Sequence, residues 1–175
     1  MATDLISLFR TRLIHIALLM GACSMLWGCS KPAVVEGVMA VEISGKTFQL
    51  DIVADKDSRT VGLGGRESME PDEGMLFSFP DIEIRNFLMR DCVFDIDIIF
   101  LDAAGRITAM HAMPVEPPRA ADESLTMYER RLPKYSSRYK AKYAIELVGG
   151  MLETLDLKEG QRIEFDIGRL ESITQ

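Results

Sequence analysis

The stretch Phe94-Asp-Ile-Asp-Ile-Ile-Phe-Leu101 decides how this chain folds. In a β-strand successive side chains point to opposite faces, so the apolar residues at every second position share one face. These apolar residues are Phe94, Ile96, Ile98 and Phe100. We predict that this face points into the core, while Asp95 and Asp97 lie on the opposite face.

Further strand-like segments with turns between them lie on both sides of this stretch. Alternation and turn residues predict strands over residues 38–43, 46–53, 75–79, 84–89, 106–113, 143–147 and 162–167. Asp55 can cap a short helix over residues 56–63, and a second short helix follows Gly149-Gly150. The pattern predicts an α+β fold, predominantly antiparallel β, with a small barrel-like sheet and two short helices.

The N-terminus has the features of an export signal. Arg10 and Arg12 precede an apolar run of about 14 residues, which is shorter than the roughly 20 that a spanning helix needs. The run ends in Leu26-Trp-Gly-Cys29, a pattern typical of a bacterial lipobox. We therefore expect a lipoprotein signal peptide over residues 1–28.

The expected mature chain begins at Cys29, which would carry the lipid anchor. Residues 29–37 form a tether, and residues 38–170 form one domain. The expected location is extracytoplasmic, with the protein anchored to a membrane. Three alternatives remain open: acylation at Cys23 instead, a soluble secreted protein cut elsewhere, and an uncleaved anchor.

Composition excludes several classes of function. Beyond residue 28 there are 18 basic and 26 acidic residues, a formal charge of −8, so nucleic acid is not an expected partner. Within the expected domain over residues 38–170, Cys92 and His111 are the only cysteine and histidine. An internal disulfide and a Cys/His zinc cluster are therefore excluded, and we expect no metal, cofactor or catalytic residue.

Three residues form the candidate ligand-binding site. A carboxylate among apolar strand residues would be expensive to bury unpaired, so Asp97 is expected to have a cationic partner. Arg66 follows a glycine-rich segment and Arg90 precedes the strand, and guanidinium groups suit carboxylates and phosphates. We predict that Arg66, Arg90 and Asp97 lie together at the main polar concavity. The alternatives are a solvated strand face and a purely structural ion pair.

One further segment is strongly polarised. Residues 128–142 contain six basic residues, one acid and three tyrosines. The segment is either a patch for anions or lipid headgroups, or a long solvated loop.

Three groups of motifs, read in order, resemble the family called domain of unknown function 192. They are Gly62-Leu63, Arg66-Glu-Ser68 and Asp72-Glu-Gly-Met-Leu-Phe77; Phe87-Leu-Met-Arg-Asp91 with Asp97 through Ile107; and Tyr143-Ala-Ile-Glu-Leu147, Gly150 and Leu157-Lys-Glu-Gly-Gln-Arg-Ile163. Leu88 stands where the family usually has tryptophan. The resemblance covers about residues 46–167 and implies a compact, β-rich, often exported domain without an agreed activity.

These observations together predict a membrane-tethered module that binds a ligand or partner without catalysis. Besides the membrane, the expected partner is a small anionic ligand or an envelope protein. The alternatives are a hydrolase- or lyase-type enzyme that uses Asp97 with Arg66 or Arg90, and a structural envelope protein.

Overall fold

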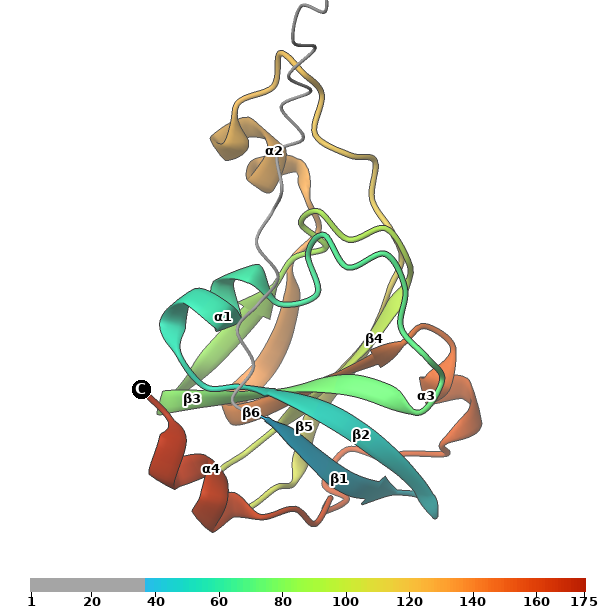
Figure 1. Ribbon diagram of the computed structural model, residues 1–175, viewed down its shortest axis with the longest axis vertical. Coiled ribbons are helices and arrows are strands. Elements are labelled where there is room, and N and C mark those ends of the chain that lie inside the picture. The colour runs from blue at the N-terminus through green and yellow to red at the C-terminus, as the bar shows by residue number, and fades with distance from the viewer. Residues whose placement is uncertain (1–36) are drawn as a thin grey trace, which may run out of the picture.

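The computed structural model describes residues 37–175 (Figure 1). The expected signal peptide, Cys29 and all of the expected tether except its last residue lie outside the described residues. Within residues 37–175, no helix has both the length and the apolar character needed to cross a membrane.

Six strands form one curled sheet. They are β1 (Val38–Ile43), β2 (Lys46–Val53), β3 (Glu73–Phe87), β4 (Ile96–Leu101), β5 (Ile107–Met113) and β6 (Tyr135–Val148). Their order is β1-β2-β3-β6-β4-β5, and every neighbouring pair is antiparallel except β2 and β3. The predicted α+β, mainly antiparallel fold is confirmed. The sheet curls without closing, because β1 and β5 remain at opposite ends of the order.

Four short helices accompany the sheet, where two had been expected. They are α1 (Lys56–Val61), α2 (Leu125–Arg131), α3 (Met151–Thr154) and α4 (Ile167–Ile173). Asp55 caps α1 as predicted, since its carboxylate accepts hydrogen bonds from the backbone N–H groups of Asp57 and Ser58. Helix α1 lies in the crossover that the parallel pair β2 and β3 requires.

The C-terminal segment differs from the predicted strand. Residues 160–163 pair with the outer side of β5 at its first residue, where the Ile107 N–H donates to the Gln161 carbonyl at 2.8 Å. The chain then turns into α4, because the Asp166 side chain accepts from the Arg169 N–H at 2.9 Å and caps the helix. The short paired segment covers one end of the open β5 edge.

Strands β3 and β6 are longer than predicted. The two expected strands of residues 75–79 and 84–89 fall largely within the single strand β3, whose pairing with β6 shifts register between Ser78 and Glu83 and again before Asn86. Strand β6 begins at Tyr135, inside the basic segment that could have been a loop. The irregular register bends β3, and this bend positions the cavity described below.

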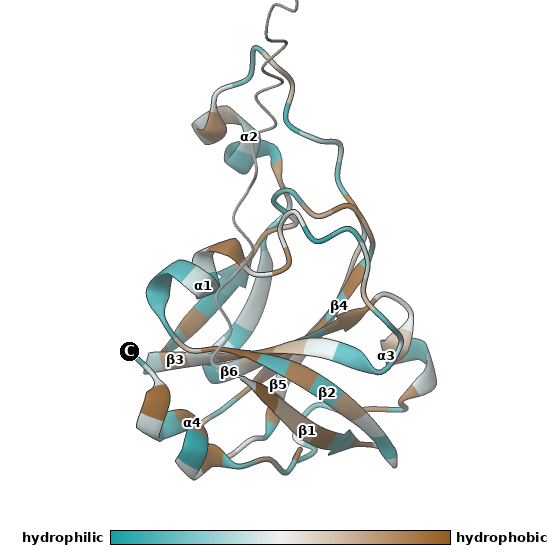
Figure 2. Ribbon diagram, viewed as in Figure 1, coloured by the Kyte–Doolittle hydropathy of each residue, from teal (hydrophilic) through white to brown (hydrophobic). Residues whose placement is uncertain are grey.

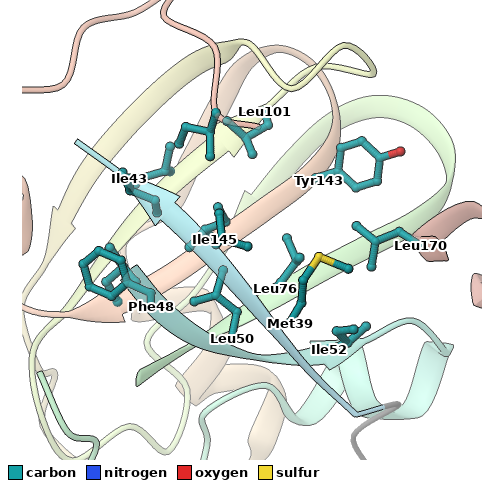
Figure 3. Close-up of a cluster of buried hydrophobic side chains, with 14 of the residues drawn as sticks. Met39, Ile43, Phe48, Leu50, Ile52, Leu76, Leu101, Tyr143, Ile145 and Leu170 are labelled. Atoms are coloured by element: carbon teal, nitrogen blue, oxygen red, sulfur yellow. The ribbon is translucent and has the colours of Figure 1, made fainter. Parts of the chain in front are cut away.

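The sheet buries both of its faces. Figure 2 shows apolar and hydrophilic residues alternating along β1 and β2, whose apolar positions face one core. Figure 3 shows part of this core, where side chains of β1, β2, β3, β4, β6 and α4 point toward one another. The second core lies on the opposite face and contains Met75, Phe77, Met89, Ile96, Ile98, Phe100 and Ala144.

Strand β4 contributes to both cores. Ile96, Ile98 and Phe100 are fully buried in the second core, which confirms the predicted inward face, and Phe94 packs half-buried against the same core. Ile99 belongs to the opposite core together with Leu101. The face that Asp97 shares with them is therefore buried, and the alternative of a solvated strand face is wrong.

Candidate functional site

The two predicted arginines hold separate acidic partners. Arg66 forms ion pairs with Asp51 at 3.0 Å and with Glu73 at 2.9 Å, which ties the glycine-rich segment to β2 and β3. Arg90 pairs with Glu129 of α2 at 2.8 Å. Within residues 37–175, no hydrogen bond or ion pair joins either guanidinium to the predicted carboxylate.

Asp97 is instead bound by backbone amides. Its Oδ2 accepts a hydrogen bond from the Leu152 N–H at 2.7 Å, and the N–H groups of Gly150 and Met151 also act on the carboxylate electrostatically. Burial raises the pKa of Asp97, and these amides oppose the rise. The carboxylate thus satisfies the orphan donors at the start of α3. Among the described residues, neither Arg66 nor Arg90 bonds directly to Asp97, because a backbone amide supplies the partner that the buried carboxylate requires.

A cavity of about 690 Å³ lies elsewhere, between α1, the loop that follows it, the bent strand β3 and the floor formed by β6. Its volume is within the range of small-molecule sites. Its lining includes Arg59, Phe77, Phe79, Arg85, Phe87 and Glu146. Of the predicted site residues, Arg90 alone lines this cavity.

Three phenylalanines of β3 form the apolar wall. The Phe77 and Phe87 rings meet edge to face with centroids 5.0 Å apart, and Phe79 meets Phe87 in the same way at 6.3 Å. Ten positions separate Phe77 from Phe87, so the bend of β3 brings them together. Such a wall favours a flat apolar group by dispersion and edge-to-face contact.

Glu146 of β6 is a buried acid in the cavity. It lies opposite Met75 on one side and Ile98 on the other, on a face of β6 that otherwise presents Ala144 and Val148. The residue is 5% exposed, and its Oε2 atom has no hydrogen-bond partner among the described residues. Burial raises the pKa of Glu146 to about 8, so the carboxyl group is mainly protonated at pH 7.

Cys92 lines the same cavity and is half-buried. Burial, as the main cause, and the negative charge of ionised Glu146, as the second, raise the pKa of the Cys92 thiol to about 12. Its Sγ atom donates to the Arg90 carbonyl oxygen at 3.6 Å. Cys92 is therefore a neutral thiol at pH 7 and a poor nucleophile.

The rim is basic. Arg59, Arg85 and Arg90 line it together with Lys56, against the single rim acid Asp81. This arrangement makes the entrance positive in a protein whose net charge is −7.

Two rim arginines are held by unlike partners. Arg59 donates to the backbone carbonyls of Ala54, Ser78 and Gln175, and burial lowers its pKa. Arg85 pairs with Asp81 and lies 4.1 Å from the centroid of the Phe79 ring. The buried Nε atom of Arg85 has no partner among the described residues. The cavity therefore combines an aromatic wall, an unpaired donor at the rim and an unpaired carboxyl group on the floor.

Glu146 did not stand out in the sequence, although one signal was present. It is the single charged residue in Tyr143-Ala-Ile-Glu-Leu-Val148, and its period-2 neighbours Ala144 and Val148 are apolar. An acid at an apolar position of a central strand is expensive unless it has a partner or a function. No group of three or more His, Cys, Asp or Glu side chains within residues 37–175 is placed to hold a metal ion.

Comparisons with known proteins agree with this fold. A protein from Sinorhizobium meliloti 1021, provisionally described as a transcription regulator, is 27% identical, with a TM-score of 0.58 over 78% of this chain and 98% of its own. A protein of unknown function from Novosphingobium aromaticivorans DSM 12444 is 23% identical, with a TM-score of 0.56 over 78% of this chain and 94% of its own.

No curated protein matches the chain. The family model for domain of unknown function 192, described as "Uncharacterized ACR", matches residues 39–165, which is more than half of the chain and nearly all of the folded domain. The chain therefore belongs to the domain of unknown function 192 family.

Proposed function

We propose that this domain is a non-catalytic binding module that takes a small organic anion with an apolar body into the cavity of about 690 Å³. The observation that carries the proposal is the combination of an aromatic wall with a positive rim. The ligand's apolar body would lie against Phe77 and Phe87, and its anionic end would lie at the rim.

Arg85 is the rim residue best suited to the anion. Its Nε donor is buried and unpaired, whereas the Arg59 guanidinium is already bonded to three backbone carbonyls. A bound carboxylate would accept a hydrogen bond from the Arg85 Nε–H group. This bond would offset the desolvation cost of the buried donor.

The alternative enzyme built on Asp97 loses its support, because amides of α3 occupy that carboxylate. A nucleic-acid role, which the description of the S. meliloti protein would suggest, is disfavoured here by the acidic net charge. A purely structural envelope protein is an outcome of the test below.

The proposed binding can be tested by thermal shift with benzoate, phenylacetate and hexanoate, each beside its uncharged primary amide. We expect the carboxylates to raise the Tm of the wild-type protein through mass action, and Arg85→Met to reduce that rise strongly. Arg162→Met is the matched control, because Arg162 pairs with Glu164 away from the cavity. No shift with any carboxylate, or equal shifts in Arg85→Met and wild type, would leave a structural role as the better explanation.

We also propose that Cys29 carries a lipid anchor that holds the domain outside the cytoplasm, where the membrane is one partner and the ligand or an envelope protein the other. The lipobox-like Leu26-Trp-Gly-Cys29 supports this. Mass spectrometry of membrane-extracted protein should give a mature chain that starts at acylated Cys29, and Cys29→Ser should abolish acylation. Cys23→Ser is the control and should leave acylation intact; a chain that starts at Cys23 contradicts the proposal.

A further inference from the structure

The floor of the cavity carries a second recognition feature that the proposed anion does not use. Glu146 belongs to β6, which lies between β3 and β4 inside the sheet, so its side chain enters the cavity from the sheet side. It is more than nine-tenths buried and unpaired at Oε2. A polar group in this condition costs free energy until a partner bonds to it.

Residues 37–175 supply no hydrogen-bond partner for the Oε2 atom of this carboxyl group. Within the described residues, the rim arginines are occupied elsewhere: Arg59 on backbone carbonyls, Arg85 on Asp81 and Arg90 on Glu129. The Cys92 thiol donates to a backbone carbonyl. A ligand or a water molecule is therefore the partner that Oε2 of Glu146 calls for beyond residues 37–175.

The state of Glu146 restricts the chemistry of that partner. With the pKa raised to about 8 by burial, the group at pH 7 is a neutral acid with one O–H donor and one adjacent carbonyl acceptor. A carboxamide offers the matching acceptor and donor side by side. A ligand with an ammonium group would have to pass the four cationic side chains of the rim and ionise Glu146 in apolar surroundings. A ligand with an apolar inner end would leave Oε2 of Glu146 unpaired.

We infer that Glu146 selects the inner end of the ligand, and that this end is a neutral carboxamide-like group with adjacent hydrogen-bond donor and acceptor atoms. The inference rests on the proposed function, since it assumes that the anionic end lies at the rim. It narrows the ligand class to molecules with an anionic end, an apolar or aromatic body and an amide-like end.

Three aromatic probes test this inference by isothermal titration at pH 7. Benzoate carries the anion and the ring, 4-carbamoylbenzoate adds the carboxamide, and 4-(aminomethyl)benzoate adds an amine instead. We expect the wild-type protein to bind 4-carbamoylbenzoate about tenfold more tightly than benzoate, as two added hydrogen bonds allow. The amine should bind no better than benzoate.

Two variants of the floor residue separate its role from simple packing. Glu146→Leu should remove the tenfold preference for 4-carbamoylbenzoate over benzoate. Glu146→Gln should retain part of this preference, because an amide still pairs with a carboxamide. Glu153→Gln in α3 is the control, because that exposed acid does not line the cavity.

The binding results separate carboxamide recognition by Glu146 from anion binding by the cavity. If benzoate binds but the carboxamide gives no gain, or the gain survives in Glu146→Leu, the inference fails and the proposed function stands. If the amine binds best, Glu146 is an ionic site and the inference also fails. If none of the three compounds binds, the proposed function and the inference fall together.

Discussion

The carboxylate of Asp97 accepts a hydrogen bond of 2.7 Å from the backbone N–H of Leu152, 55 positions further along the chain. This contact joins strand β4 to the first turn of α3. A helix of four residues has little stability of its own, so the sheet residue serves as its cap from a distance.

Asp97→Ala should therefore destabilise the fold without changing the cavity. The variant leaves the Leu152 amide at the start of α3 unpaired, and we expect the free energy of unfolding to fall by about 1–3 kcal/mol in urea denaturation. Asp97→Asn should cost less, because one amide oxygen still accepts. The exposed Glu42→Gln is the control. A loss of benzoate binding in folded Asp97→Ala would show that Asp97 belongs to the binding site after all.

Ile98→Ala should be severely destabilising. The side chain is fully buried in the second core, and removing it leaves a cavity in addition to the lost burial. We expect a cost of about 2–5 kcal/mol in the same denaturation experiment. Ile82→Ala, at a residue that is 45% exposed, should cost much less. Equal costs at the two positions would contradict the assignment of the β4 faces.

The stability of the protein should fall as pH rises because of Glu146. Its pKa is about 8 in the folded protein, against an ordinary value of 4.5. Between these values the unfolded chain has released the proton that the folded chain retains, so a rise in pH favours unfolding.

Glu146→Gln removes this titration, so its stability relative to wild type should increase by roughly 1.4 kcal/mol for each pH unit between about 4.5 and 8, and then level off. Denaturation of both proteins at pH 5, 6, 7 and 8 measures the difference and cancels the contribution of other acids. A difference that does not change with pH would show that Glu146 has an ordinary pKa.

Cys92 should resist alkylation in the folded protein. A thiol whose pKa is about 12, rather than 9.0, has roughly a thousandfold less thiolate at pH 8. Iodoacetamide labelling followed by peptide mass spectrometry should show slow modification of Cys92 in buffer and rapid modification in urea. Comparable rates in the two conditions would mean that the thiol is neither desolvated nor protected.

The local sequence was sufficient for much of the fold. Alternation along 94–101 predicted which side chains of β4 enter the second core, and Asp55 predicted where α1 begins. Both signals depend on residues close together in the chain, where strand and helix geometry determines side-chain direction. The motifs quoted from residues 62–163 likewise predicted the family that the model of residues 39–165 confirms.

Contacts between residues far apart in the chain decided which partners the charged side chains have. The sequence correctly suggested that Asp97 needs a partner, but an arginine and a set of backbone amides satisfy a carboxylate equally well, and the position of α3 selected the amides. Arg66 and Arg90 met other acids for the same reason.

The sequence by itself determined the strand faces, the α1 cap and the family, because these follow from residue spacing and local geometry. The tertiary structure alone decided the cavity: the bend of β3 brings Phe77 to Phe87, and the pairing of β6 between β3 and β4 places Glu146 on an apolar floor. Burial and the absence of a partner for Oε2 within the described residues are properties of the packed chain, since every segment is hydrated when taken alone.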